Sequence, residues 1–369
     1  MADVFFVDFR TESEKDNVPN KIGRLFKKAG LDGTFGKGDL VGVKTHFGER
    51  GNTAFLRPQY LAKVVDLVSA NGGRPFLTDS NTLYVGMRAN AVDHLETAAL
   101  HGFSHPVVNA PVVIADGLKG QDETVVDVDL KRCRSIRVGS AAMQADSIMC
   151  VSHLKGHMLT GFGGAMKNLG MGFGSRAGKL DMHMEVTPRV KNDKCRGCGT
   201  CVRKCPEHAI KLSKRKAVID DDKCIGCGEC LVVCPYSAVD FGDCCMDSNA
   251  IQEKIAEYCY GIMKGREGRF GFITFVMDVV PYCDCAPFND APIIPNVGIL
   301  ASKDIVAIDQ AAADLVNGAP GLKGTKLKKG MRAGDDKFKA LFDNLDWSVQ
   351  LEYGESIGLG ERDYELRKV

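Results

Sequence analysis

The feature that most constrains this chain is a repeated arrangement of eight cysteines. Two strings share the same spacing: Cys195, Cys198, Cys201 and Cys205, then Cys224, Cys227, Cys230 and Cys234. A proline follows the last cysteine of each string. Each string therefore reads C-x-x-C-x-x-C-x-x-x-C-P, which is the ligand spacing for a pair of 4Fe–4S clusters. The chain is predicted to bind two such clusters.

The same spacing predicts how the ligands are shared between the clusters. Three cysteines at i, i+3 and i+6 wrap a tight loop around one cluster, and the fourth reaches the other cluster of the pair. We expect the first cluster to be held by Cys195, Cys198, Cys201 and Cys234. We expect the second cluster to be held by Cys224, Cys227, Cys230 and Cys205.

Zinc is the alternative occupant of such cysteines, because a zinc ribbon needs four thiolates per ion. Two duplicated strings, each ending in Cys-Pro, favour iron–sulfur clusters instead. The region resembles bacterial two-cluster ferredoxins over its whole length, including Ile210 and Val239, which would pack between the clusters. The chain has 15 cysteines and no export signal, and this combination also points to metal or catalysis rather than to disulfides.

The segments on both sides of the cysteines alternate between two patterns. Short apolar runs typical of buried strands lie at 4–7, 40–43, 74–78, 147–151, 272–276 and 297–300. Segments with apolar residues at helical spacing lie at 20–29, 58–71, 90–101, 248–262 and 304–316. This alternation predicts an α/β fold, with a mostly parallel sheet that carries helices on both faces.

Composition changes near Lys191 and sets the predicted domain boundaries. We expect an α/β domain over 1–190 and 244–369, interrupted by a small α+β ferredoxin-like module over 191–243. The charge is nearly balanced, with 48 Lys plus Arg against 47 Asp plus Glu, which argues against a nucleic-acid partner. No apolar run approaches the ~20 residues of a membrane span. The start has no signal-peptide pattern, so a cytoplasmic location is expected.

A second candidate site follows the strand predicted at 147–151. His153, Lys155 and His157 alternate with apolar or small residues, so an extended chain would place all three on one face. Ligands of open α/β sheets bind at the carboxyl ends of strands, where these residues lie. We expect His153, Lys155, His157 and Lys167 to bind and protonate an anionic substrate. The alternative is a structural turn with solvated His and Lys side chains.

Three other patterns lie near this loop. A helix that begins at Ala165 would offer free N–H groups to an anion. Segments 45–49 and 78–81 also follow strands and would line the same rim. Residues 181–185, if extended, would present Asp181, His183 and Glu185 on one side. One candidate set of ligands for a divalent metal consists of His153, His157 and Glu185, and surface polar groups are the alternative.

Cys283 and Cys285 form a C-x-C pair after the strand predicted at 272–276. They are too close in sequence for a disulfide of relaxed geometry. They could ligate a metal, act as redox or nucleophilic thiols, or be buried apolar side chains. The other cysteines in ordinary α/β segments are expected in the core: Cys133, Cys150 and Cys259.

Further strings resemble a known family. His153-x-Lys155 followed by the segment 163–170 (GGAMKNLG), and the segment 298–304 (GILASKD) with Ala307-x-Asp309, resemble domain-of-unknown-function family 362 in its iron–sulfur branch. The resemblance covers nearly the whole chain, and the cysteine module lies where that branch has it. The family implies an α/β fold and bound 4Fe–4S clusters, and it supplies no reaction. Some members lack the module, so the α/β domain can have a task that is not inherently redox.

Together these patterns favour an iron–sulfur oxidoreductase. Its two 4Fe–4S clusters would relay single electrons from a redox partner such as ferredoxin to a pocket that holds an anionic small molecule. A basic edge could face such an acidic partner or be a solvated hairpin: Lys211, Lys214, Arg215 and Lys216. Two alternatives stay open. One is a ferredoxin-like carrier or assembly protein whose α/β domain binds a partner, and the other is a non-redox enzyme with structural clusters.

Overall fold

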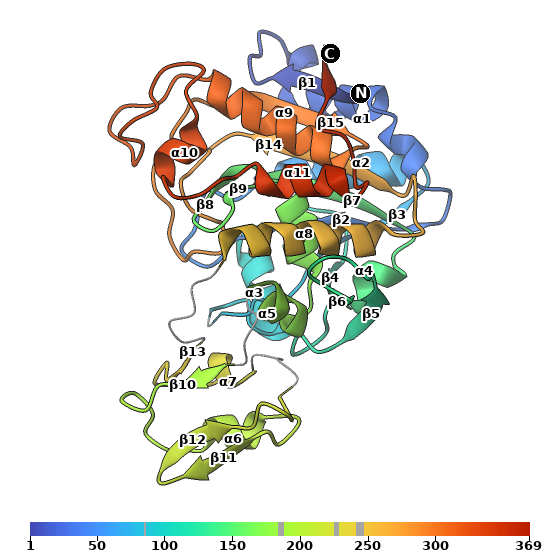
Figure 1. Ribbon diagram of the computed structural model, residues 1–369. Helices are drawn as coiled ribbons and strands as arrows, with labels where there is room; N and C mark the ends of the chain where they lie inside the picture. The colour runs from blue at the N-terminus through green and yellow to red at the C-terminus, as the bar shows by residue number, and fades with distance from the viewer. Residues whose placement is uncertain (85, 184–187, 225–228, 241–246) are drawn as a thin grey trace.

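The computed structural model describes residues 1–84, 86–183, 188–224, 229–240 and 247–369. Cys227 and Glu185, two of the predicted ligands, lie outside the described residues. A large α/β body carries a small module at one end, drawn in yellow-green in Figure 1. No helix in the described part of the chain is long and apolar enough to cross a membrane.

An eight-stranded sheet forms the centre of the body. Its order is β16 (Tyr364–Lys368), β1 (Ala2–Asp8), β15 (Gly298–Ser302), β14 (Phe270–Val276), β7 (Ser147–His153), β2 (Leu40–Lys44), β3 (Arg74–Asp79) and β4 (Val112–Ile114). β15 pairs antiparallel with β1 and β14, and every other neighbouring pair in this sheet is parallel. The prediction of a mostly parallel sheet is confirmed.

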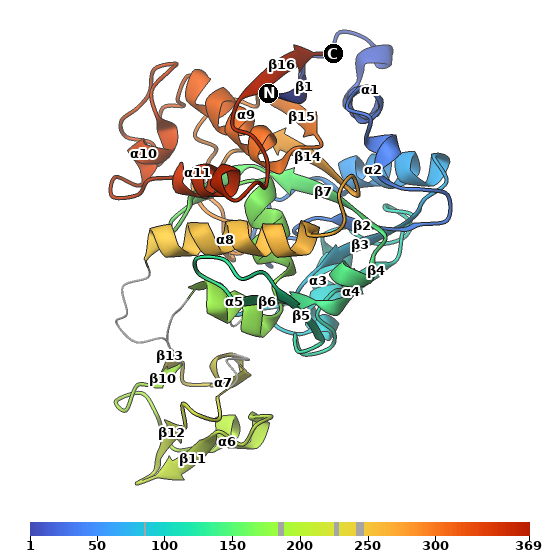
Figure 2. The same cartoon turned by 45° about the vertical axis from the view of Figure 1, so that its right-hand side comes forward.

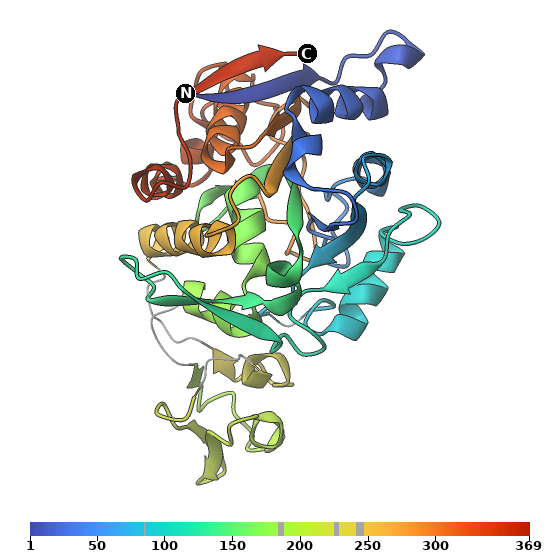
Figure 3. The same cartoon turned by 90° about the vertical axis from the view of Figure 1, so that its right-hand side faces the viewer.

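Helices cover both faces of the sheet, as predicted. Successive residues of β7 enter two different apolar cores, because side chains alternate along a strand. One core contains residues of α1 (Val18–Lys28), α2 (Pro58–Ala70) and α3 (Ala91–Leu100). The other contains residues of α8 (Ser248–Met263), α9 (Ile305–Gly318) and α11 (Val349–Ser356). Figure 3 shows the blue helices and the orange and red helices on opposite sides of the sheet.

Polar side chains fix where several predicted helices begin. The Asn17 side chain accepts a hydrogen bond from the backbone N–H of Asn20 ahead of α1, and Asn90 caps α3 in the same way. Asp304 accepts the N–H groups of Val306 and Ala307, so α9 begins one residue later than the segment predicted at 304–316.

Short elements complete the body. They are η1 (Glu14–Asp16), η2 (Leu31–Thr34), β5 (Glu123–Asp127), β6 (Ser135–Gly139), α4 (Ser140–Gln144), β8 (Lys155–His157), β9 (Gly161–Gly163), the π-helical segment η3 (Lys167–Met171), α5 (Arg176–His183) and α10 (Lys337–Leu341). β5 pairs with β6, and β8 pairs with β9, both antiparallel. The β8–β9 hairpin and η3 follow β7 directly, so they lie at the carboxyl edge of the central sheet.

The extended structure predicted for residues 181–185 is wrong over the part that is described. Asp181 and His183 belong to α5. The Asp181 carbonyl accepts a hydrogen bond from the Lys254 Nζ at 2.7 Å, and its carboxylate accepts one from the Tyr258 hydroxyl at 3.1 Å. Both partners lie on α8, so packing between two helices overrides the short alternating pattern in the sequence.

The module is built from short elements (Figure 2). They are β10 (Arg189–Val190), α6 (Thr200–Lys204), β11 (Ile210–Ser213), β12 (Lys216–Ile219), α7 (Glu229–Val232) and β13 (Val239–Asp240). β10 pairs antiparallel with β13, and β11 pairs antiparallel with β12. The first of these pairs brings the start and the end of the module together. Ile210 and Val239 are buried in its small core.

Candidate functional site

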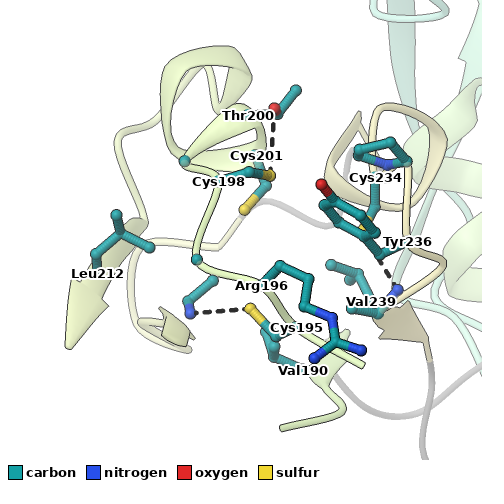
Figure 4. A pocket seen from close by; sticks show the side chains of 15 residues that line it. Val190, Cys195, Arg196, Cys198, Thr200, Cys201, Leu212, Cys234, Tyr236 and Val239 are labelled. Atoms are coloured by element: carbon teal, nitrogen blue, oxygen red, sulfur yellow. Dashed lines mark hydrogen bonds between the residues drawn. The ribbon is translucent and has the colours of Figure 1, made fainter. Parts of the chain in front are cut away.

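The first hollow of the module is lined by one predicted set of four ligands. Cys195, Cys198, Cys201 and Cys234 border a space of about 340 Å³. Figure 4 shows the four side chains with Leu212 and Tyr236 beside them. The first three cysteines come from the loop before α6 and from α6 itself, whereas Cys234 follows α7. The structure thus brings a cysteine of the second string to the loop of the first.

The second hollow has the reciprocal arrangement and a similar size, about 360 Å³. Cys205 of the first string lies in its wall with Cys224 and Cys230 of the second string. Glu229 also lines it. Cys205 follows the short helix α6, which contains Cys201, so it lies one helical turn beyond that ligand of the first hollow.

Backbone N–H groups point at the cysteine sulfurs in both strings. The N–H of Ala209 donates to the Cys205 Sγ at 3.3 Å, and that of Ala238 donates to the Cys234 Sγ at 3.2 Å. The N–H of Ala217 donates to the Cys195 Sγ at 3.4 Å. Such donors stabilise thiolates and tune the reduction potential of a cluster that they ligate. The thiol ligands and their donors therefore fit two 4Fe–4S clusters.

A buried ion pair connects a residue in the wall of the second hollow to the body. The Arg176 guanidinium on α5 binds the Glu229 carboxylate and the Ala89 carbonyl. The Arg176 side chain is 1% exposed. Figures 1 and 2 show α7, which carries Glu229, nearer to the body than α6. The second hollow therefore lies on the body side of the module, and the exposed Cys198 lies in the first hollow.

In the body, His153 ends β7 and is held on both sides of its ring. Its Nδ1 lies 3.0 Å from the Asp284 Oδ1, and its Nε2 lies 2.9 Å from the Met277 carbonyl oxygen. Both partners are oxygen atoms that accept hydrogen bonds, so each ring nitrogen of His153 faces an acceptor. Burial opposes ionisation of Asp284, but His153 and Lys155 hold its pKa well below the usual range.

The three residues predicted to share one extended face do not do so. His153 belongs to the central sheet, whereas Lys155 and His157 lie in β8, which pairs with β9. Leu154 between them donates its N–H to the Phe275 carbonyl, and the chain leaves the sheet there. Lys155 nevertheless returns to the site, because its Nζ lies 3.2 Å from the Asp284 Oδ2. Asp284 therefore joins two of the predicted cations.

His157 is held by different contacts from those of His153. Its Nδ1 lies 3.0 Å from the Thr160 hydroxyl oxygen, and the one proton of that hydroxyl is donated to the Phe162 carbonyl. The N–H of Leu159 lies 3.3 Å from the same ring nitrogen. Burial, then the charge of Lys167, holds the pKa of His157 well below its usual value. The ring is therefore neutral.

Lys167 contacts the C-x-C pair. Its Nζ lies 3.5 Å from the Cys283 Sγ. Burial would lower the pKa of Lys167, but the neighbouring sulfurs raise it, so the group stays an ammonium. A hydrogen bond from the Cys285 thiol lowers the pKa of Cys283 well below its usual value, and Lys167 adds to this effect. The same hydrogen bond raises the pKa of Cys285, so Cys283 is the more acidic thiol of the pair.

The anion site expected at the helix that begins at Ala165 is already filled by the chain itself. The N–H groups of Ala165 and Met166 donate to the two carboxylate oxygens of Asp309, at 2.6 and 2.9 Å. Glycine is required at 164, because a Cβ there would overlap the Asp309 carboxylate. Burial raises the pKa of Asp309 to about 7. The expectation of free N–H groups is therefore wrong.

A buried charged network at the ends of β2 and β3 was missed by the sequence prediction. The Lys44 Nζ lies 2.9 Å from both the Asp79 Oδ1 and the Asn168 Oδ1. Arg88 lies 3.6 Å from the Asp79 Oδ2 and 3.3 Å from the Glu49 Oε2. Burial opposes ionisation of Asp79, but Lys44 and its other cationic neighbours lower its pKa. Segments 45–49 and 78–81 supply part of this network, as their position after strands predicted.

Several buried polar atoms of this network have no hydrogen-bond partner among the described residues. They include the Asp79 Oδ2, the Arg88 Nη2, both ring nitrogens of His94 and the Asp116 Oδ2. Buried polar groups are normally satisfied, so such atoms mark a place for water or a ligand. Backbone contact links the network to the His153 site, because the Glu49 N–H donates to the Asp284 carbonyl at 2.9 Å. The feature of the sequence that could have indicated this network is Lys44, a charged residue at the end of an apolar strand.

The described residues contain no group of three His, Cys, Asp or Glu side chains that converges closely enough to hold one metal ion. His153 and His157, two of the three predicted ligands of a divalent metal, are bound to different partners, Asp284 and Thr160. The structure thus gives each histidine a partner within the protein.

The chain belongs to the family described as Domain of unknown function (DUF362), whose model matches residues 41–314. This span contains the body site and the whole module. The structure of the lactate racemase apoprotein from Thermoanaerobacterium thermosaccharolyticum aligns with a TM-score of 0.36 and 12% sequence identity. The alignment covers 75% of this chain and 51% of the racemase, so this chain matches about half of the racemase's length. No curated protein sequence matches the chain.

Proposed function

We propose that this chain is an iron–sulfur protein of its family and that two 4Fe–4S clusters relay single electrons to the pocket at the carboxyl edge of the body's sheet. An anionic small molecule would be reduced there. The observation that carries the proposal is the exchange of cysteines between two equivalent hollows, as the duplicated spacing requires. The buried Arg176–Glu229 pair supports a path from the second cluster into the body.

The outer face of the module suits an electron donor. Leu212 and Tyr236, both 47% exposed, lie beside the first hollow. Lys211, Lys214 and Arg215 are exposed on the β11–β12 hairpin, and this positive charge favours an acidic partner such as ferredoxin. Lys216, which was expected on the same edge, donates instead to the carbonyl groups of Asn192 and Cys195. It therefore supports the ligand loop.

In the pocket, the side chains of the chain itself would bind the substrate and supply protons. Lys167 is a buried ammonium that favours an anion, and His157 is a neutral imidazole beside it. His153 and Lys155 are held by Asp284, which fixes their positions before substrate binds. The clusters would supply electrons, and a reduction also needs protons, for which Lys155 and Lys167 are the candidate donors.

The direct test is anaerobic purification of the full chain, followed by iron and sulfide analysis and electron paramagnetic resonance after reduction with dithionite. We expect four iron and four sulfide per cluster and two interacting paramagnets. Cys234→Ser should remove the first cluster, and Cys205→Ser should remove the second. Zinc alone, or no signal after reduction, would refute the proposal.

The pocket is tested by mass spectrometry of small molecules that purify with the protein. Lys167→Met should lose a bound anion while the visible iron absorbance stays unchanged. Lys119→Met, an exposed lysine outside the site, is the matched control. A stably bound protein partner with no small molecule would favour the carrier or assembly function. Activity that persists with the clusters locked in one redox state would favour structural clusters.

A further inference from the structure

The body site contains two sulfur atoms, those of Cys283 and Cys285, that a path for single electrons does not explain. We propose that Cys283 and Cys285 form a dithiol–disulfide redox centre and that its substrate is a small anionic disulfide. This inference rests on the proposed function, because the two clusters would return the centre to its reduced form.

The loop that carries the pair is held rigidly by its middle residue. The Asp284 side chain points to His153 and Lys155, and its carbonyl accepts the N–H of Glu49. Residues 284 and 285 form a turn, in which the Ala286 N–H donates to the Cys283 carbonyl at 3.0 Å, and this turn holds the two cysteines close together. The Cys285 N–H lies 3.5 Å from the Cys283 Sγ.

A glycine lets this loop approach β8 closely. A Cβ at Gly156 would lie 2.6 Å from the Pro281 carbonyl oxygen, which is too near for any side chain. The Gly156 N–H donates to the Val280 carbonyl at 2.8 Å. This approach places the C-x-C pair over the region that holds Lys155 and Lys167.

The surroundings of the pair distinguish it from the core cysteines. Cys283 is 7% exposed and has the Lys167 ammonium at 3.5 Å, whereas Cys285 is half-buried. Cys259 is fully buried, and its Sγ donates to the Met166 carbonyl at 3.2 Å. Reactive thiols occur in electropositive, partly accessible places, and buried structural thiols are inert. The C-x-C pair therefore has the surroundings of reactive thiols, and Cys259 has those of a structural thiol.

The reaction with a disulfide R–S–S–R′ balances without another reagent. The Cys283 thiolate attacks one substrate sulfur, the substrate S–S bond breaks, a Cys283–S–S–R bond forms and R′S⁻ leaves with the electron pair. Cys285 then loses its proton to solvent and attacks the Cys283 sulfur. This second step forms the Cys283–Cys285 disulfide and releases RS⁻.

Two electrons and one proton restore the starting state, which is one thiolate and one thiol. Each of two clusters would hold one electron, so the pair of clusters matches a two-electron couple. A disulfide across a single residue is strained, and strained disulfides are the readily reduced ones. The positive charge of Lys155 and Lys167 favours a substrate that carries carboxylates.

The experiment uses the anaerobic, cluster-loaded full chain and two probes. Dithiobis(nitrobenzoate) is a disulfide with a carboxylate on each half, and dithiodipyridine is a neutral disulfide. We expect the peptide with Cys283 and Cys285 to lose two hydrogens in mass spectrometry while the cluster absorbance is unchanged. Lys167→Met should lower the preference for the anionic probe about tenfold, as expected for removal of a charge within ~4 Å.

Substitutions separate the two sulfurs. Cys285→Ser should stop the reaction at a mixed disulfide with one half of the probe, and Cys283→Ser should abolish it. Cys259→Ser, which keeps a donor to the Met166 carbonyl, is the matched control and should react like the wild type. A reduced peptide after treatment, or a Cys283→Ser variant that reacts normally, would overturn the inference.

The outcomes also separate this inference from the proposed function. Intact paramagnetic signals with an unreactive C-x-C pair would overturn the dithiol centre alone. Disulfide formation in protein that shows no cluster signal would overturn the proposed function and leave the dithiol chemistry supported. If dithionite-reduced clusters fail to reopen the Cys283–Cys285 disulfide, the assigned electron source is wrong.

Discussion

The module and the body are stabilised in different ways. The body has an apolar core on each face of its sheet, built from residues of every layer. Among the described residues of the module, seven form its buried core: Cys195, Cys201, Ile210, Ala217, Cys230, Ala238 and Val239. Three of the seven are predicted ligands. Small domains with too little core depend on metals or crosslinks, so we expect bound clusters to be the main source of stability of the module.

The two regions also differ in what binds their functional groups. In the body, the Asp284 carboxylate binds both His153 and Lys155 within the protein, and Asp309 binds two backbone N–H groups. In the module, the sulfurs of the predicted ligands line hollows of about 340 and 360 Å³. The body site is therefore preorganised by the chain alone, whereas the module would need the proposed clusters to complete its sites.

Removal of iron should have the largest effect of all, because it should unfold one region and leave the other folded. Metal-binding free energy is folding free energy in small metal domains, so chelation should unfold the module and leave the body folded. Limited proteolysis should cut within 191–243 only in the iron-free protein. Circular dichroism of the body helices and the main thermal transition should persist.

The matching control is the same protease treatment of cluster-loaded protein, which should resist cleavage within the module. A single loss of all structure on chelation would contradict the independence of the body. Unchanged resistance after chelation would contradict the dependence of the module on metal.

Arg176→Met should have the next largest effect, because it strands a buried carboxylate at the junction of the two regions. Loss of one partner of a buried ion pair costs about 3–5 kcal/mol. We expect this loss in the free energy of unfolding measured with urea, together with easier proteolysis at the edge of the module.

Arg189→Met is the control within the module. Arg189 lies 3.5 Å from Asp221 in an exposed pair, and such pairs contribute less than about 1 kcal/mol. Equal effects of the two substitutions would show that Arg176 does not fasten the module to the body.

Asp309→Asn tests the preorganised body. An asparagine offers one acceptor to two N–H donors, so one donor is left unsatisfied at a cost of about 1–3 kcal/mol. The pKa of Asp309 is raised to about 7 from an ordinary 3.8. The folded chain therefore binds this proton more tightly than the unfolded chain, and the contribution to stability is full below pH 3.8 and lost as pH rises through about 7.

Asparagine does not titrate, so the destabilisation by Asp309→Asn should be largest below pH 3.8, should shrink between pH 3.8 and about 7, and should be constant above about 7. Urea unfolding of both proteins at several pH values measures the difference. A difference that grows with pH would show that Asp309 is ionised more easily in the folded chain.

Features set by local spacing could be predicted from the sequence, and features set by distant contacts could not. Six strands of the central sheet were predicted because apolar runs are local, whereas β4 and β16 were not, and the reversed direction of β15 depends on pairing with β1 and β14. Asp284 and Asp309 were missed because their partners lie 131 and 144 residues away. The helical state of residues 181–183 likewise depends on α8, which is remote in sequence.

Lys167→Met should have the smallest effect of these substitutions. It tests the body site alone, because the expected change in the pKa of Cys283 does not involve the clusters. The Lys167 ammonium, 3.5 Å from the Cys283 Sγ, favours the thiolate, so its loss should raise the pKa of Cys283. A nearby charge is worth about one pKa unit or more, so alkylation of Cys283 by iodoacetamide near pH 7 should slow about tenfold. The rate is followed by mass spectrometry of the peptide over a range of pH.

The same shift of the pH profile should occur in iron-free protein, because the groups that face Cys283 all belong to the body: Lys155, Lys167, Asp284 and Cys285. Lys119→Met should leave the profile unchanged. If the shift appeared only in cluster-loaded protein, the charge of the module would act on the thiolate, and the body site would not be preorganised by its own residues.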